Sequence, residues 1–400
     1  MSLLNRYSNV VKERGKKTKV ALVGAGQMGQ GIVTQINKME DTDLVLIVDK
    51  NQEKLDIARS KYDKDITISS HLDSLDDQDL DVVIEATGTP SSGADVAFKV
   101  LNRNINLILL NVETEATIGL ALNKEAEKNN TIVTVGDGDE PVAAVELFNF
   151  AKEISFDVIA IGKGKNNPFD VFKTPKDLEK EALKKNMNPY MLTSFVDGSK
   201  TMIEMAALAN YLDFNIDTDG MHGPNSTYDE LNSIFIPKSS GGILEKTNIV
   251  DFAFGVAPGV FAIVYSEDDY VNYEMEYLKM GKGPYWTLYR PYHLTSLEIP
   301  RTIMKLMVDK ETQLSAKKWN VEVVAHSKKD LEAGTNLGSI GGENIYGKAM
   351  RVENSKNLAP LGIAENNILN SEVKKGEPIE IENIDITDNQ LYKYWLSQNS

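Results

Sequence analysis

Short apolar runs alternate with segments of helical spacing over the first 135 residues of the chain. The runs cover residues 20–23, 44–48, 81–87, 106–111 and 131–135, with helical patterns between them such as residues 94–101 and 118–128. Continuous apolar strands separated by helices are typical of a parallel sheet that is covered on both faces. The pattern therefore predicts an α/β fold whose first domain, residues 1–150, is a doubly wound parallel Rossmann sheet.

A glycine-rich turn follows the first apolar run and opens the first helical segment. Gly24 permits a tight turn, Gly26 lets the backbone approach a pyrophosphate, and Gly29 lets helix and strand pack closely. The second apolar run ends at Asp49, whose carboxylate can accept hydrogen bonds from a ribose hydroxyl. The residues predicted to contact a nicotinamide dinucleotide here are Gly24, Gly26, Gln27, Met28, Gly29 and Asp49. The alternative is a glycine-rich turn that binds no ligand.

The carboxyl ends of parallel strands share one edge of a sheet, where ligands bind. Thr87 and Gly88 follow one predicted strand, Glu113 follows the next, and residues 136–139 follow the last. We therefore expect Thr87, Gly88 and Glu113 beside the cofactor, and Asp139 beside the substrate. The cofactor is predicted to be NAD or NADP, because Asp49 repels a 2′-phosphate whereas Lys50 and the nearby Lys54 partly offset that repulsion.

Composition excludes several classes of function. The formal net charge of -16 argues against nucleic acid and anionic membranes as partners. The chain has no cysteine, so disulfides, thiolate nucleophiles and zinc–sulfur sites are ruled out. Residues 1–14 lack the apolar core of a signal peptide, and no apolar run is long enough to span a bilayer. These features predict a soluble cytoplasmic protein with a small-molecule substrate.

The character of the sequence changes twice after residue 150. Residues 151–320 mix helical and strand patterns, which predicts an α+β catalytic domain, and a helix over residues 296–310 is expected to pack back on the first domain. Residues 321–400 contain short apolar runs broken by turns, which predicts a small β-rich domain. That uneven apolar tail is compatible with a homodimer.

One helical segment carries the strongest catalytic candidates. It begins at Ser199, so Lys200 and Glu204 lie one turn apart on the same face, and Asp197 lies near the helix start. A lysine held near carboxylates can donate a proton to a substrate oxygen or polarise a carbonyl. The alternative is a surface Lys–Glu pair that contributes a few tenths of a kcal/mol, on the order of 0.3. We take Lys200 as the proton donor, with Asp197 and Glu204 setting its orientation.

Three cations are predicted to bind an anionic substrate. Lys163 and Lys165 flank Gly164 in a turn just after a strand over residues 156–161. Arg290 and His293 lie in an aromatic loop, residues 281–294, that leads to a helix; Arg290 offers a planar fork and His293 could relay protons. The alternatives are a solvated turn for the lysines and an aromatic plug for the loop.

The acidic pair Asp139 and Glu140 could bind a divalent metal, Mg or Mn, together with Asp197 or Glu204. No spacing rule supports such a site, so the metal ligands stay unknown.

The helix over residues 197–200 and 205–209 resembles the catalytic helix of homoserine dehydrogenase, in which an Asp and a Lys lie one turn apart and the Lys is assigned to proton transfer. Here the interval from Asp197 to Lys200 is three residues rather than four. The wider match covers nearly the whole chain and resembles a branch of homoserine-dehydrogenase-like oxidoreductases that ends in a SAF domain. The segments that carry it are residues 136–141, 162–165, 256–261 and 289–294, with 331–335 and 373–378 similar to SAF modules.

The resemblance implies an NAD(P)-dependent oxidoreductase that acts on a small, oxygen-rich, anionic substrate. The branch includes a 1-deoxy-D-xylulose 5-phosphate reductoisomerase-like enzyme that makes 2-C-methyl-D-erythritol 4-phosphate, a reaction in which a divalent metal would hold the vicinal oxygens. One alternative is a simple NAD-dependent dehydrogenase of a sugar acid or a homoserine-like alcohol. Another is a non-catalytic cofactor-sensing or carbohydrate-binding protein.

Overall fold

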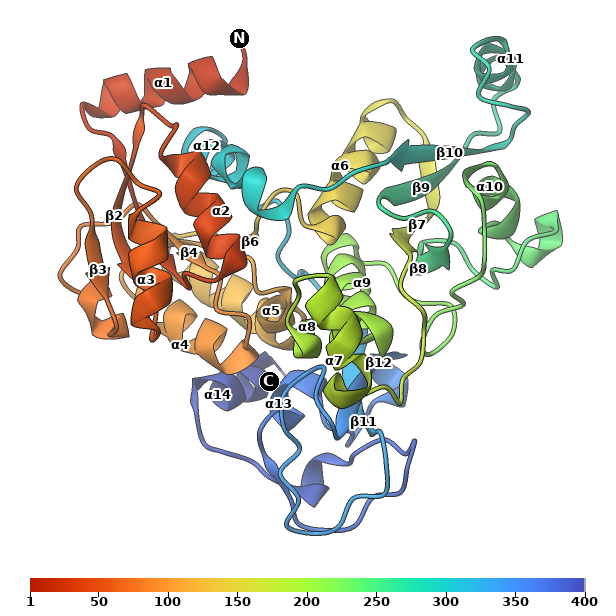
Figure 1. Cartoon of the computed structure of the whole chain (residues 1–400). Helices are drawn as coiled ribbons and strands as arrows, with labels where there is room; N and C mark the ends of the chain where they lie inside the picture. Colours follow the sequence, from red (N-terminus) through yellow and green to blue (C-terminus); the bar gives the residue numbers. More distant parts are fainter. Residues whose placement is uncertain (399–400) are drawn as a thin grey trace. The chain divides into compact units, whose positions relative to one another are not determined.

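The computed structural model describes residues 1–398 and divides into two compact units (Figure 1). Unit 1 comprises Met1–Val142, Leu294–Ser315 and residues 388–398. Unit 2 comprises Ala143–His293 and Ala316–Thr387, so residues 316–387 belong to the same unit as the central part of the chain. The division of the chain into three domains, residues 1–150, 151–320 and 321–400, stays a prediction.

Unit 1 is built on a six-stranded parallel sheet in the order β3-β2-β1-β4-β5-β6. Its strands are β1 (Thr18–Val23), β2 (Thr42–Val48), β3 (Thr67–Ser69), β4 (Val82–Glu85), β5 (Asn106–Leu109) and β6 (Val133–Val135). The connecting helices are α2 (Gln27–Ile36), α3 (Gln52–Arg59), α4 (Pro90–Leu101) and α5 (Val112–Lys128). The predicted α/β fold with an N-terminal Rossmann sheet is confirmed, and its strand order reverses between β1 and β4.

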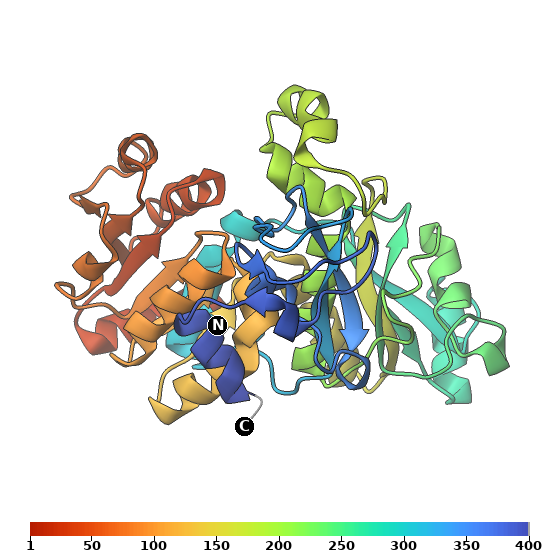
Figure 2. The same cartoon turned by 90° about the horizontal axis from the view of Figure 1, so that it is seen from below.

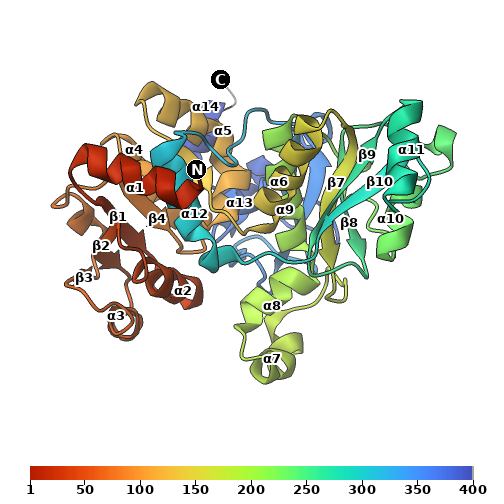
Figure 3. The ribbon, with the colours of Figure 1, turned by 90° about the horizontal axis from the view of Figure 1, so that it is seen from above.

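Helices from distant parts of the chain complete unit 1. The helices α1 (Leu3–Arg14) and α12 (Ile299–Val308) lie side by side (Figure 3). Ile299 and Ile303 are fully buried in the core that also contains Val20 of β1. The C-terminal helix α14 (Gln390–Gln398) packs on α4 and α5. The helix expected over residues 296–310 is α12, which is shorter than expected. It begins at Ile299, because the proline that follows Ile299 fits only the first turn of a helix.

Unit 2 contains a mixed sheet in the order β10-β9-β7-β8. Its strands are β7 (Asp157–Lys165), β8 (Ile249–Phe254), β9 (Val260–Tyr265) and β10 (Tyr285–Arg290), and only β7 and β8 pair in parallel. The helices of this region are α6 (Glu140–Glu153), α7 (Pro175–Lys184), α8 (Pro189–Val196), α9 (Ser199–Leu212), α10 (Leu231–Ile234) and α11 (Asp269–Tyr277). Phe235, just after α10, stacks on Phe261 of β9, on the face of the sheet that is opposite to α9.

The C-terminal part of unit 2 is β-rich, as predicted. It contains the hairpin of β11 (Val321–Ser327) and β12 (Ile345–Arg351), the short pair β13 (Ile368–Leu369) and β14 (Ile384–Asp385), and α13 (Leu361–Ala364). The hairpin packs against α9 (blue strands in Figure 2). The Gly347 backbone amide donates to Ser199 Oγ at 2.8 Å, and the side-chain amide of Asn210 donates to the Val321 carbonyl at 2.9 Å. Whether this segment is a SAF domain stays a prediction.

Two segments that were predicted as loops are strands. Residues 281–294 contain β10, in which alternate residues face opposite sides of the sheet. The turn expected after residue 161 is the second half of β7. The glycines of β7 do not form a turn; they let the backbone of neighbouring segments come close to the strand. A Cβ at Gly162 would lie 1.8 Å from the Asp251 carbonyl oxygen, and a Cβ at Gly164 would lie 2.5 Å from the Val256 carbonyl oxygen.

A buried acid in β11 makes the stability of the protein depend on pH. Burial raises the pKa of Glu322 to about 8, while a hydrogen bond from the Val323 amide lowers it. Because the folded state binds this proton more tightly than the unfolded state does, stability falls as the pH rises from the unfolded pKa of about 4.3 towards 8. Glu322→Gln should remove on the order of 1–4 kcal/mol of that fall. Urea unfolding of both proteins across this range is the measurement; an unchanged slope would contradict the assignment.

Among residues 1–398, no helix combines the length and the apolar character that a membrane span requires. The cytoplasmic location and the homodimer stay predictions.

Candidate functional site

The glycine turn of unit 1 has an open cradle at the N-terminus of α2. Gly24 has a φ of 104°, and a Cβ there would lie 2.5 Å from the Ala86 carbonyl oxygen. A Cβ at Gly29 would lie 2.1 Å from the Gly24 carbonyl oxygen, whereas one at Gly26 would have no atom within 4 Å. Gly26 is also the N-cap of α2, whose first amides and dipole attract an anion. These residues therefore fit a dinucleotide pyrophosphate, with Gln27 and Met28 exposed beside it.

Asp49 is held against this turn at the end of β2. Its carboxylate accepts hydrogen bonds from the Ala25 amide at 2.7 Å and the Asn51 amide at 2.8 Å. Each carboxylate oxygen has a second lone pair, so the group can still accept from a ribose hydroxyl. Asp49 is half-buried, whereas the neighbouring Lys50 is exposed.

The same edge of the sheet carries the other predicted cofactor residues. Thr87 and Gly88 are exposed after β4, and Glu113 is half-buried in the first turn of α5. Glu85, the last residue of β4, is a site residue that the sequence did not reveal; it is fully buried and accepts a hydrogen bond from the Thr87 amide. The sequence pattern that could have pointed to Glu85 is a charged residue at the end of an apolar strand.

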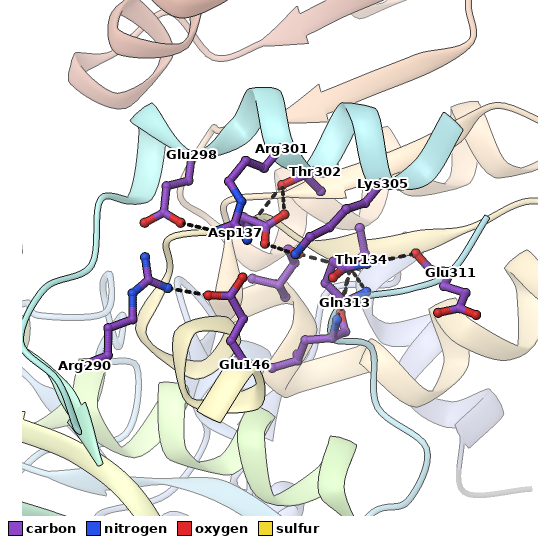
Figure 4. A network of polar contacts seen from close by, with 12 residues as sticks. Thr134, Asp137, Glu146, Arg290, Glu298, Arg301, Thr302, Lys305, Glu311 and Gln313 are labelled. Atoms are coloured by element: carbon purple, nitrogen blue, oxygen red, sulfur yellow. Dashed lines mark hydrogen bonds and ion pairs between the residues drawn. The ribbon is translucent and has the colours of Figure 1, made fainter. Parts of the chain in front are cut away.

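Loop 136–139 is fixed to α12 within unit 1 (Figure 4). The buried Asp137 carboxylate accepts from Lys305 Nζ at 2.5 Å and from Thr302 Oγ1 at 2.9 Å, while Thr302 Oγ1 accepts from the Asp137 amide at 2.8 Å. Asp139, the predicted substrate residue, is also buried, and its carboxylate accepts from the Glu140 amide at 3.0 Å. Asp137 therefore anchors the loop to α12. Asp139 lies two residues further along the same loop.

Unit 2 brings two of the three predicted catalytic residues, Lys200 and Glu204, together with Lys163 and Lys165 in one charge cluster, in which Lys200 is half-buried and the other three are buried. Lys163 of β7 forms a short hydrogen-bonded ion pair with Glu204 of α9, and both side chains are buried. Lys200 Nζ lies 4.0 Å from the other oxygen of the Glu204 carboxylate. Since Lys163 and Lys165 are two residues apart on a strand, they project towards the same face. Lys165 donates to the Phe195 carbonyl at the end of α8.

Asp197 has a partner that the sequence did not reveal. Its carboxylate forms a 2.8 Å ion pair with Lys328, which follows β11, and accepts from the Ser199 amide at 2.9 Å. Lys328 also donates to the carbonyls of Lys173 and Gly342, at 2.8 Å each. Burial raises the pKa of the Asp197 carboxyl, and Lys328 lowers it. Asp197 thereby joins the start of α9 to the C-terminal segment, and its role in orienting Lys200 stays a prediction.

Arg290 lies on the same sheet row as Lys163, because both residues pair with Val260 from opposite sides. Its guanidinium donates to Glu146 of α6 at 2.7 Å and lies 4.7 Å above the Tyr292 ring (Figure 4 shows the Glu146 contact). His293 is half-buried after this strand. Within residues 1–398 no group of three or more His, Asp or Glu side chains is arranged to hold a metal ion, so the Mg or Mn site stays a prediction.

Two family models match the chain, one after the other. Residues 24–136 match the NAD binding domain of homoserine dehydrogenase, and residues 138–299 match the catalytic domain of oxidoreductase DRL. The chain is an NAD(P)-dependent oxidoreductase. These matches confirm three predictions: that the protein is an enzyme, that its cofactor is NAD, and that its cofactor domain is of the homoserine dehydrogenase type.

Comparison with solved structures shows three distant likenesses. A dehydrogenase from Chromobacterium violaceum is 19% identical with a TM-score of 0.30, over 39% of this chain and 46% of the other. GenD2 from gentamicin A biosynthesis, in complex with NAD, is 14% identical with a TM-score of 0.40, over 74% and 88%. The scyllo-inositol dehydrogenase from Lactobacillus casei, with NAD(H) and scyllo-inositol, is 16% identical with a TM-score of 0.41, over 69% and 76%. These likenesses assign no substrate to the oxidoreductase, and curated proteins gave no match.

The position of Asp49 leads to a prediction about cofactor choice. Asp49→Asn keeps the shape of the side chain but removes the charge that repels a 2′-phosphate, so it should bring the affinities for NADPH and NADH about ten-fold closer. Fluorescence titration with both cofactors measures the ratio. Glu53→Gln, in the first turn of α3, is the matched control and should leave it unchanged. An Asn variant that still discriminates as the wild type does would contradict this role.

Proposed function

We propose that the protein transfers hydride between NAD(P) and the carbon of a hydroxyl group in a small, oxygen-rich, anionic substrate, without rearranging its skeleton. The observation that carries this proposal is the charge cluster in the segment that matches an oxidoreductase catalytic domain. A lysine ammonium close to a buried carboxylate can transfer a proton to the substrate oxygen as hydride reaches the carbon.

In the direction of reduction, a nicotinamide cofactor bound at the glycine turn would supply hydride to the carbonyl carbon. Lys200 gives its ammonium proton to the carbonyl oxygen, which becomes the hydroxyl. In the direction of oxidation the neutral Lys200 amine accepts that proton. Glu204 lies beside both Lys163 and Lys200, and its carboxylate sets the orientation of Lys200. Lys163, Lys165 and Arg290 bind the anionic group of the substrate, with His293 and Asp139 as further substrate contacts.

Reductoisomerisation of 1-deoxy-D-xylulose 5-phosphate is the second candidate. It is favoured by the resemblance of residues 136–141 and 289–294 to the reductoisomerase-like branch. In that reaction a rearrangement of the carbon skeleton precedes reduction, and a divalent metal would hold the vicinal oxygens.

A substrate screen separates the two candidates. Purified protein is incubated with NAD and a panel of sugar acids, polyols and homoserine, and separately with NADPH, Mg²⁺ and 1-deoxy-D-xylulose 5-phosphate. Direct dehydrogenation predicts NAD reduction with members of the first panel. Consumption of NADPH in the second assay, with 2-C-methyl-D-erythritol 4-phosphate as the product, would overturn it in favour of reductoisomerisation.

A further inference from the structure

Glu85 is a fully buried carboxyl at the ligand-binding edge of the unit 1 sheet. Its Oε1 atom accepts two hydrogen bonds from Thr87, one from the amide at 2.7 Å and a shorter one from the hydroxyl. Among residues 1–398, its Oε2 atom has no hydrogen-bond partner. A buried carboxyl oxygen without a partner is costly, so its presence at the ligand-binding edge needs a physical explanation.

The strand order locates this carboxyl relative to the two halves of the cofactor. The glycine turn after β1 fits the pyrophosphate, and Asp49 after β2 fits the ribose of the adenosine half. The adenosine half of a bound cofactor would therefore lie over β1, β2 and β3. The nicotinamide half would lie on the other side of the switch point, towards the ends of β4 and β5, where Glu85 and Thr87 are found.

We propose that Glu85 determines the preference of the site between the two redox states of the cofactor: it holds Thr87 at the rim, and its charge favours NAD⁺ over NADH. The nicotinamide ring carries a positive charge in NAD⁺ and none in NADH. A carboxylate in a buried position interacts with that charge more strongly than one in water. This role concerns cofactor binding alone, so it stands apart from the proposed function of Lys200.

The environment of Glu85 makes this preference depend on pH. Burial raises its pKa to about 7, whereas the Thr87 hydrogen bonds and the Asn111 amide lower it. The charged group that acts on it is Glu113 of α5, which raises the pKa; Thr87 and Asn111 are neutral. Below the pKa Glu85 is uncharged and the two redox states bind alike at this position. Above it, NAD⁺ binding gains relative to NADH binding.

The test is calorimetric titration of wild type and Glu85→Gln with NAD⁺ and NADH at about pH 6 and about pH 8, on either side of the pKa of about 7. The ratio of the two dissociation constants should change roughly five- to ten-fold between these pH values in the wild type and stay constant in the Gln variant. Glu53→Gln is the control for loss of an exposed acid and should behave as the wild type does. A pH-dependent ratio that persists in Glu85→Gln overturns the proposal.

A second readout needs no variant. Because NAD⁺ favours the ionised carboxyl, its binding to the wild type near pH 7 should release protons, and NADH should release fewer. Titrations in two buffers of different ionisation enthalpy measure that release. Equal proton release by the two cofactors overturns the proposal even if Glu85→Gln fails to fold.

Discussion

Lys200→Met is expected to lower kcat by about 10²–10⁴-fold while the affinity for NADH stays unchanged. Methionine preserves much of the side-chain volume but has no proton to transfer. The dissociation constant for NADH should not change, because the cofactor cradle is formed by unit 1 whereas Lys200 belongs to unit 2. Steady-state kinetics on the substrate found in the screen, together with NADH titration, measure both quantities.

Two further variants define the role of Lys200. Lys200→Arg keeps the positive charge but cannot give up a proton, so it should retain substrate affinity and still lose kcat. Lys180→Met removes an exposed lysine from α7 in the same unit and should match the wild type. A Lys200→Met enzyme whose kcat lies within about three-fold of the Lys180→Met enzyme would refute proton transfer by Lys200.

The features of the site that the sequence predicted are local ones. The glycine turn is specified by a few consecutive residues, because each glycine meets a steric demand inside one βα unit. The proximity of Lys200 and Glu204 follows from helical spacing alone. The expected alternation of strands and helices likewise gave the parallel sheet of unit 1.

The features that the sequence did not predict depend on contacts between distant segments. The ion pair of Lys163 with Glu204 joins a strand to a helix that begins far along the chain. Nothing in the pattern around Lys328 distinguishes it from other lysines of the β-rich tail. Gly162 and Gly164 were interpreted as turn residues, although they permit close approach of the backbone of residues far from them in sequence. Tertiary packing, which a single sequence does not display, decides all three.

An ion pair between Lys328 and Asp197 joins the C-terminal segment to the start of α9, the proposed catalytic helix. Removing this ion pair has a large expected effect on stability. Lys328 is almost completely buried; it forms an ion pair with the Asp197 carboxylate and donates hydrogen bonds to the carbonyls of Lys173 and Gly342. Lys328→Met would leave Asp197 buried without this partner and should lower the free energy of unfolding by about 3–5 kcal/mol at neutral pH. Urea denaturation followed by circular dichroism measures it.

The pH dependence and a double variant separate loss of this ion pair from a general packing defect. Without Lys328 the folded-state pKa of Asp197 rises further above its unfolded value, so the variant favours the protonated acid and its deficit should shrink as the pH falls. Asp197→Asn combined with Lys328→Met removes the buried charge and should recover much of the stability. Lys329→Met, at the adjacent exposed position, should cost little. A deficit that is independent of pH and persists in the double variant would mean that Lys328 contributes by packing, and that the tail does not act on α9 through Asp197.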